Sequence, residues 1–363
     1  MRELPPIDAD IRRAATPPGH LYHDPAIHAA ALERVFAPSW QLVPADAPVP
    51  AAVGHAAPLT LLPGSLDEPL LLRRDEAGDL GCVSNVCTHR GMLLQREPGP
   101  CSQLRCGYHG RSFAPDGTLT HMPGFEDAHD FPGPDDHLRR PGLFRLGPLT
   151  FLQVVPGVPA AAVLGPLQAA MAWYPWGDLR FAPDRSRDYE VAANWALYCE
   201  NYLEGFHIPW VHPELNRRLD WRAYEVHLHA RATLQVGMGV AGDPVFDLPA
   251  GHPDHGRPVA AWYWWVYPNL MLNFYPWGLS VNIVEPLGPT RCRVRFQSHV
   301  ARPDLLDRGA GGPLDAVEME DEAVVEAVQR GVRSRLYHRG RYAPRHEIGT
   351  HHFHRLLVAD LTA

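Results

Sequence analysis

The sequence contains no lysine, and its 33 basic residues are all arginine. This absence excludes Schiff-base catalysis and phosphate binding by a P-loop, because both depend on a lysine amine. The formal net charge is −8 and no basic run is present, so we expect no nucleic-acid partner. Cysteine is scarce as well, with six residues in 363. That density excludes a disulfide-rich secreted scaffold, and cysteines near histidines are considered first as metal ligands.

Long hydrophobic runs are also missing. The most apolar stretch, residues 154–173, is interrupted by prolines and glycines and cannot form a membrane-spanning helix. The N-terminus carries Glu3, Asp8 and Asp10 and is not followed by the apolar segment of a signal peptide. We therefore expect a cytoplasmic protein without a membrane segment. Proline is abundant by contrast, with 38 residues, which indicates a globular protein rich in loops.

The pattern of elements divides the chain into three segments. Residues 1–37 are expected to form an arm and a short helix. Residues 38–157 contain short β-like runs between glycine and proline turns and predict an all-β domain. Residues 158–363 combine strands that follow one another with a few helices, which predicts an α+β domain with an antiparallel sheet. The candidate elements of this last segment are helices at 194–207 and 317–332 and strands at 259–266, 279–284 and 291–300.

Two short loops in the predicted all-β domain each offer one thiol and one imidazole. The first contains Cys87 and His89, and the second contains Cys106 and His109. These four side chains could hold one zinc ion, although structural zinc sites usually take two cysteines from one loop and two histidines from the other. A Rieske [2Fe–2S] cluster uses two cysteines and two histidines, which is the set found here. We interpret the four residues as ligands of such a cluster, with zinc as the alternative.

A second set of metal ligands is predicted around the helix at 194–207. Its polar face is formed by Glu200, Asn201, Glu204 and His207. Pro209 is expected to end the helix, so that His212 can turn back toward His207. Two histidines and one carboxylate on one side of a metal are the donor set of non-haem Fe(II) oxygenases.

The carboxylate of this set is sought in the acidic run at 318–322. On a helix Asp321 lies in the middle of a stripe of valines, whereas Glu320 and Glu322 lie about 100° to either side. A carboxylate on a buried face is costly unless it is paired or bound to a metal. We therefore assign Asp321 to the metal together with His207 and His212. The glutamates of the run, Glu318, Glu320 and Glu322, are interpreted as a solvated helix surface.

Together these motifs resemble those of the Rieske non-haem iron oxygenases of the alpha-subunit type. The resemblance implies an N-terminal Rieske [2Fe–2S] domain and a C-terminal antiparallel-sheet catalytic domain of the helix-grip (START-like) type, with a mononuclear Fe(II). It also implies a homotrimer in which each cluster serves the iron of the next subunit. In that arrangement Glu204 would bridge His207 to a cluster-binding histidine of the neighbour, and Asn201 would lie near the iron.

Three further segments, at 267–273, 328–334 and 340–354, resemble choline monooxygenase and its relatives that oxidise quaternary ammonium compounds. Aromatic faces can hold a trimethylammonium group, and we expect Trp264, Trp265 and Tyr267 to contribute to such a cage. No nicotinamide or flavin site is evident, so electrons are expected from a separate NAD(P)H-dependent reductase or a ferredoxin. The alternatives are a ring-hydroxylating or N/O-demethylating oxygenase for an aromatic substrate, and a non-catalytic electron carrier or ligand-binding protein.

Overall fold

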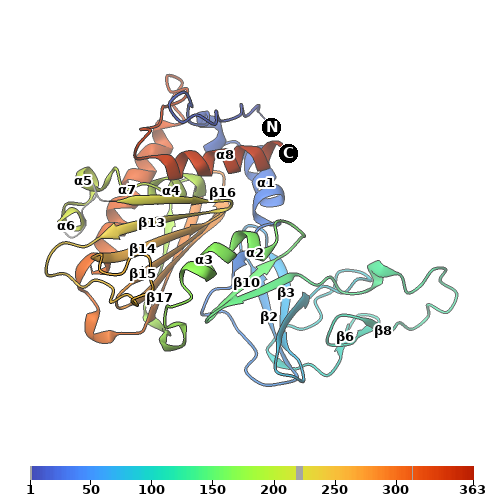
Figure 1. Ribbon diagram of the computed structural model, residues 1–363. Helices are drawn as coiled ribbons and strands as arrows, with labels where there is room; N and C mark the ends of the chain where they lie inside the picture. The colour runs from blue at the N-terminus through green and yellow to red at the C-terminus, as the bar shows by residue number, and fades with distance from the viewer. Residues whose placement is uncertain (1, 218–223, 313) are drawn as a thin grey trace. The chain divides into compact units, whose positions relative to one another are not determined.

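The computed structural model describes residues 2–217, 224–312 and 314–363 (Figure 1). The chain forms two compact units, one from Ala37 to Gly157 and one that joins the residues up to Phe36 with Val158–Ala363. The N-terminal segment, predicted as a separate arm, is thus part of the second unit. Its arginine Arg34 donates a hydrogen bond to the carbonyl of Leu361 at 2.8 Å, which ties the first helices to the C-terminal helix.

The unit from Ala37 to Gly157 consists of small antiparallel sheets, as the sequence predicted. The first contains β1 (Gln41–Leu42), β10 (Leu149–Gln153) and β9 (Gly142–Leu146), in that order. The second has the order β4 (Leu80–Ser84), β3 (Glu68–Arg74), β2 (His55–Leu61) and β5 (Gly99–Pro100). The third contains β6 (Leu104–Arg105), β7 (Ser112–Phe113) and β8 (Leu119–His121).

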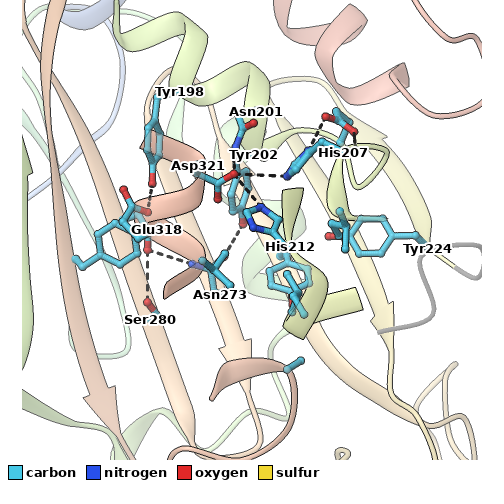
Figure 2. Close-up of a pocket in the computed structure, with 18 of the residues that line it drawn as sticks. Tyr198, Asn201, Tyr202, His207, His212, Tyr224, Asn273, Ser280, Glu318 and Asp321 are labelled. Carbon is cyan, nitrogen blue, oxygen red and sulfur yellow. Dashed lines mark hydrogen bonds and ion pairs between the residues drawn. The ribbon is translucent and has the colours of Figure 1, made fainter. Parts of the chain in front are cut away.

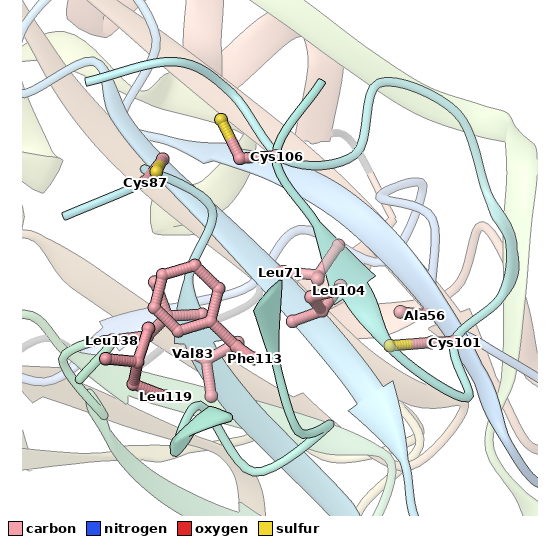
Figure 3. Packing of buried hydrophobic residues seen from close by; sticks show 10 residues of the cluster. All are labelled: Ala56, Leu71, Val83, Cys87, Cys101, Leu104, Cys106, Phe113, Leu119 and Leu138. Carbon is pink, nitrogen blue, oxygen red and sulfur yellow. The ribbon is translucent and has the colours of Figure 1, made fainter. Parts of the chain in front are cut away.

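The core of this unit lies between the second and third sheets. Leu71 and Val83 from one sheet pack with Phe113 from the other, and all three are at most 1% exposed. The thiols of Cys87 and Cys106 belong to the same buried cluster (Figure 3). The two cysteine loops are therefore anchored on the hydrophobic core.

The other unit is built on a seven-stranded antiparallel sheet, which confirms the predicted α+β class. Its strands, in spatial order, are β11 (Arg180–Val191), β17 (Arg291–Val300), β16 (Gly278–Gly288), β15 (Leu270–Tyr275), β14 (Val259–Val266), β13 (Ala232–Met238) and β12 (Glu225–His229). Every residue of β14 and β15 is buried, because both faces of the sheet are covered at its centre.

The described part of this unit also contains α-helices, and α4 and α8 pack against the sheet. The helices are α1 (Pro25–Ala31), α2 (Ala160–Val163), α3 (Gly165–Ala170), α4 (Trp195–Tyr202), α5 (Ile208–Val211), α6 (Pro213–Asn216), α7 (Leu314–Gly331) and α8 (Ile348–Thr362). Helix α4 contacts α7, α8 and strand β16, and α8 contacts β12 (Figure 1). Among the described residues, no helix has both the length and the apolar composition required to cross a bilayer.

Helix α4 ends at Tyr202, five residues earlier than the sequence predicted. The carboxylate of Glu204 accepts hydrogen bonds from the backbone N–H groups of Phe206 and His207. In a continuous helix these groups would donate to carbonyls of the preceding turn, so the side chain replaces the helical bonds and stops the helix. Glu204 and His207 consequently lie in the turn after α4 and do not share its polar face.

Pro209 was expected to end the helix but occupies the first turn of α5. Proline suits that position because its missing N–H would have no helical partner there. The short α5 then places His207 before its first residue and His212 after its last. The two histidines are thus brought together by a turn and a short helix, and the prediction that the break lies at Pro209 was wrong.

Candidate metal centres and substrate pocket

His207, His212 and Asp321 form a group whose potential ligand atoms all lie within 4.8 Å of one another. The Asp321 Oδ1 atom is 2.9 Å from Nε2 of His212 and 3.6 Å from Nε2 of His207 (Figure 2). The two imidazole rings are inclined at 76° with centroids 5.1 Å apart. Two Nε2 atoms and a carboxylate oxygen that converge in this way suit a non-haem iron with open positions.

The opposite nitrogen of each imidazole contacts a glutamate. His207 Nδ1 is 2.6 Å from Oε1 of Glu204, and His212 Nδ1 is 2.7 Å from Oε2 of Glu320. These contacts fix each ring and leave its Nε2 available for a metal. Burial alone would lower the pKa of His212, but its bonds to Asp321 and Glu320 raise the pKa overall. Glu320 is 41% exposed at its side chain, in keeping with its interpretation as helix surface, but the sequence did not predict its contact with His212.

Asn201 holds the carboxylate of the group. Its Nδ2 atom donates a hydrogen bond to Asp321 Oδ1 at 2.5 Å, from α4 to α7. Asn201 therefore lies next to the three candidate ligands, close to the place that the family resemblance implies. The amide fixes the carboxylate oxygen that faces both imidazoles.

Glu318 lies in the interior of the protein, on the same side of α7 as Asp321. It was interpreted as solvated, yet it is 3% exposed and its Oε2 accepts a 2.5 Å hydrogen bond from the Tyr198 hydroxyl. Burial raises the pKa of Glu318 well above its usual value, and the nearby Asp321 adds to the effect. Glu318 precedes Asp321 by three residues, so the two share a helix face at about 60°. That spacing was available in the sequence and could have identified it.

A small cavity of about 110 Å³ adjoins the three candidate ligands (Figure 2). Its aromatic wall is formed by Tyr198, Tyr202, Tyr224, Tyr263, Tyr275 and Phe296. Tyr263 lies at the centre of this wall, with ring centroids 5.9 Å from Tyr275 and 6.1 Å from Tyr224. Its polar wall includes Asn273, Ser280, Asn282 and Glu318.

The predicted cage of Trp264, Trp265 and Tyr267 does not line this cavity and was wrong. Side chains alternate along β14, so Tyr263 faces the cavity while Trp264 points to the other side of the sheet and lines a separate hollow. Trp265 packs on Phe353 of α8 at 5.2 Å. The Tyr267 ring lies 5.0 Å from the Arg231 guanidinium. The aromatic residues of this segment indicated an aromatic cage. Which of them line the cavity depends on the side of the sheet that each residue of β14 faces.

In the smaller unit, the loops of Cys87 and Cys106 have the same backbone pattern. Each cysteine N–H donates to the carbonyl five residues later, and each cysteine carbonyl accepts from the glycine four residues later. Those glycines, Gly91 and Gly110, both have φ of +75°, a left-handed conformation that side chains disfavour. The sequence shows that a glycine follows each cysteine by four residues. It does not show that the two loops share the same backbone hydrogen bonds.

The four side chains of these loops are graded in exposure. Cys87 and Cys106 are 2% and 3% exposed, whereas His109 is exposed and His89 is half-buried. The two imidazole centroids are 4.8 Å apart. Burial, with the charges of neighbouring basic groups, lowers the pKa of His89, which favours the neutral form that binds metals. A thiol pair on the core and an imidazole pair at the surface suit a cluster that exchanges electrons through its histidines.

Arg111 fills the position behind the second loop, and its side chain is almost wholly buried. Its guanidinium lies over the rings of Phe113 and Phe131 and pairs with Asp136 at 2.5 Å. The positive charge of Arg111 is therefore compensated by Asp136. This pairing allows the planar guanidinium to pack among aromatic rings.

Both units of this chain are similar to known proteins. Residues 179–363 match the family described as "Ring hydroxylating alpha subunit (catalytic domain)", and residues 51–132 match "Rieske [2Fe-2S] domain". The chain is 31% identical to a chloroplastic choline monooxygenase of Arabidopsis thaliana, over 97% of this chain and 84% of the relative. It is 27% identical to the carnitine monooxygenase oxygenase subunit of Escherichia coli (strain K12), over 96% and 95% of the two chains.

Solved structures share the fold. A quaternary ammonium Rieske monooxygenase in complex with L-carnitine has a TM-score of 0.72 and 22% identity, with 99% of both chains covered. Naphthalene 1,2-dioxygenase from Rhodococcus sp. has a TM-score of 0.66 and 20% identity, with 95% of this chain and 94% of that chain covered. The predicted fold class, a Rieske domain with an antiparallel-sheet catalytic domain, is confirmed.

Proposed function

Because this chain belongs to the Rieske non-haem iron oxygenases of the ring-hydroxylating alpha-subunit family, we propose that it hydroxylates a small quaternary ammonium compound. The family membership makes the chain an oxidoreductase with two cofactors, a Rieske [2Fe–2S] cluster and a mononuclear iron. When bound, the cluster supplies single electrons and the iron activates dioxygen.

The ligands of the two cofactors are assigned by donor chemistry. Cys87, His89, Cys106 and His109 would hold the cluster, and His207, His212 and Asp321 would hold the iron. The second assignment rests on three ligand atoms that converge within 4.8 Å. Glu204 and Glu320 would keep the two imidazoles oriented through their Nδ1 atoms, and Asn201 would hold the carboxylate of Asp321.

Glu204 is the proposed bridge for electrons that arrive from a neighbouring subunit. Its carboxylate already binds His207 Nδ1 at 2.6 Å. Phe206 and Trp210, which flank this turn, are 40% and 82% exposed, so the surface beside Glu204 is accessible to a second chain. We propose a homotrimer that receives electrons from a separate NAD(P)H-dependent reductase or a ferredoxin.

The observation that supports a quaternary ammonium substrate is the aromatic wall of the cavity. Tyrosine and phenylalanine faces attract an organic cation without a counter-ion in contact. Among the residues that the structure describes, no arginine lines the cavity. The acidic residues Glu318 and Asp321 both line it. A cavity of about 110 Å³ is also small beside the roughly 300–1,000 Å³ typical of larger ligands. Such a site favours a compact cation over a fused-ring aromatic compound.

A single-turnover experiment tests this function. The iron-loaded protein, with its cluster reduced chemically, is mixed with ¹⁸O₂ and one of choline, L-carnitine, glycine betaine or naphthalene. We expect one labelled oxygen atom in the product of at least one cation and none in naphthalene. Oxidation of naphthalene alone would contradict the proposal. Retention of the cluster without oxidation of any compound, even with the mononuclear site filled, would instead indicate an electron carrier.

A further inference from the structure

Glu318 is a buried carboxyl group in the substrate cavity that no cationic side chain of the described residues pairs with. Its Oε2 accepts the hydrogen bond from Tyr198 at 2.5 Å. Its Oε1 is buried and has no hydrogen-bond partner among the described residues. A buried polar atom without a partner is costly unless a water, an ion or a ligand completes it. Of the residues that line the cavity, Glu318 has such an atom.

The position of Glu318 relates it to the substrate. Figure 2 shows Glu318 on one side of the cavity and Tyr224 on the other, with Asp321 and His212 between them. A cation held by the tyrosines near Tyr224 would therefore extend past the candidate metal ligands toward Glu318. The group opposite the trimethylammonium end would lie beside the carboxyl group of Glu318, which lines the cavity.

The other polar groups on that side are already paired with one another. The Tyr202 hydroxyl donates to Asn273 Oδ1 at 2.8 Å, and Asn273 Nδ2 donates to Asn282 Oδ1 at 3.1 Å. The Ser280 hydroxyl donates to the same Asn282 oxygen at 3.4 Å. Glu318 thus has the buried oxygen that most needs a partner from the ligand.

The surroundings decide which partner this oxygen takes. A buried carboxylate without a cationic partner is expensive, and its neutral acid form is less so. Burial raises the pKa of Glu318 accordingly. Since Tyr198 donates to Oε2, the proton of a neutral acid is carried by Oε1. Glu318 lines the cavity, so this proton is the one available to a ligand oxygen.

We propose that Glu318 is a specificity-determining residue that donates a hydrogen bond, as a neutral carboxylic acid, to an oxygen atom of the substrate. The inference rests on the proposed function and adds the second recognition element: the substrate carries a hydroxyl or carboxylate oxygen at the end opposite its trimethylammonium group. Tyr198 is a positioning residue that orients the acid.

The test compares binding of three cations to the iron-loaded protein by calorimetry. Choline carries a hydroxyl, glycine betaine carries a carboxylate, and ethyltrimethylammonium has no oxygen. We expect wild-type protein to bind at least one oxygen-bearing cation about tenfold or more tightly than ethyltrimethylammonium. Whichever of the two binds more tightly identifies the oxygen.

Two substitutions separate a neutral donor from a charged partner. Glu318→Gln keeps an uncharged hydrogen-bond donor, so the preference should stay within about threefold of wild type. Glu318→Met keeps the approximate volume and removes the donor, so the preference should disappear. Tyr198→Phe should reduce the preference by an intermediate factor. The same changes at Glu322, which lies on α7 outside the cavity lining, serve as matched controls and should have no effect. The visible absorption of the cluster reports an intact fold in each variant.

The outcomes distinguish this inference from the proposed function. A loss of preference in Glu318→Gln as large as in Glu318→Met would overturn the neutral donor, because only a charged group explains it. An unchanged preference in Glu318→Met would overturn any role for this residue while leaving the substrate class intact. If none of the three cations binds to wild-type protein, the proposed function and this inference both fail.

Discussion

At the scale of single residues, the carboxylates around the two histidines contact different nitrogen atoms of the imidazole rings. Asp321 faces both Nε2 atoms, whereas Glu204 and Glu320 each contact one Nδ1 atom. A carboxylate on Nδ1 fixes the tautomer, orients the ring and makes Nε2 a stronger ligand. Glu320 is 41% exposed at its side chain, so its role can be tested with little effect on folding.

Glu320→Ala should weaken metal binding at the His207–His212–Asp321 group by about 10–100-fold, because His212 loses its orienting partner. Titration with Co²⁺, followed by visible absorption in protein that lacks the mononuclear metal, measures this affinity directly. Glu322→Ala removes a glutamate from the same helix without touching either histidine and should bind Co²⁺ like wild type. Equal affinity in the Glu320 variant would show that His212 needs no such support.

At the scale of elements, the start and the end of α4 shape the site. Asn194 caps the helix through a 2.9 Å bond from the Ala196 N–H to its side-chain oxygen. Its amide also donates to the Pro289 carbonyl at 2.8 Å, and its backbone N–H donates to Gln329 at 2.7 Å. At the other end, the Glu204 carboxylate terminates the helix. Asn194 thus caps α4 with its side chain and joins it to α7 through its backbone N–H. Glu204 turns the chain toward His207 at the other end.

Asn194→Ala should destabilise the larger unit by about 1–3 kcal/mol, because the cap is lost and the half-buried Pro289 carbonyl loses its donor. Thermal unfolding followed by circular dichroism gives the shift in Tm. Asn194→Asp keeps the capping oxygen but cannot donate to Pro289, so its Tm should fall between the other two. A Tm for Asn194→Ala equal to that of wild type would mean that α4 is held by its packing alone.

At the scale of the whole molecule, the two metal centres reside in separate compact units. The cysteine loops belong to the unit from Ala37 to Gly157, and the histidine–aspartate group belongs to the other. Each unit has its own core, so the ligands of one centre are not needed to shape the other. Each centre should therefore be removable by itself.

His207→Ala should abolish oxygenation and leave the visible absorption of the cluster unchanged, with iron reduced from three atoms per chain to two. Cys87→Ser should do the converse and remove the cluster absorption while one iron remains bound. Iron analysis together with absorption spectra checks both variants. Loss of both signals in either variant would contradict two independent centres.

The sequence alone determined the chemical inventory of this protein. Ligand-type residues at short spacings, such as Cys87 with His89, can be read directly because the chain itself keeps them close. Periodicity placed Asp321 on the inner face of a helix, and the antiparallel sheet followed from successive strands. These inferences use distances of a few residues, over which backbone geometry is nearly fixed.

Only the tertiary structure decided what surrounds that inventory. The orientation of His212 depends on its contact with Glu320 of α7, and the buried state of Glu318 depends on Tyr198 lying across from it. The choice of Tyr263 over Trp264 depends on strand register. Each of these contacts joins residues that are far apart in the sequence. Tertiary packing selects the partner of each side chain, and hydrophobic periodicity alone does not specify that partner.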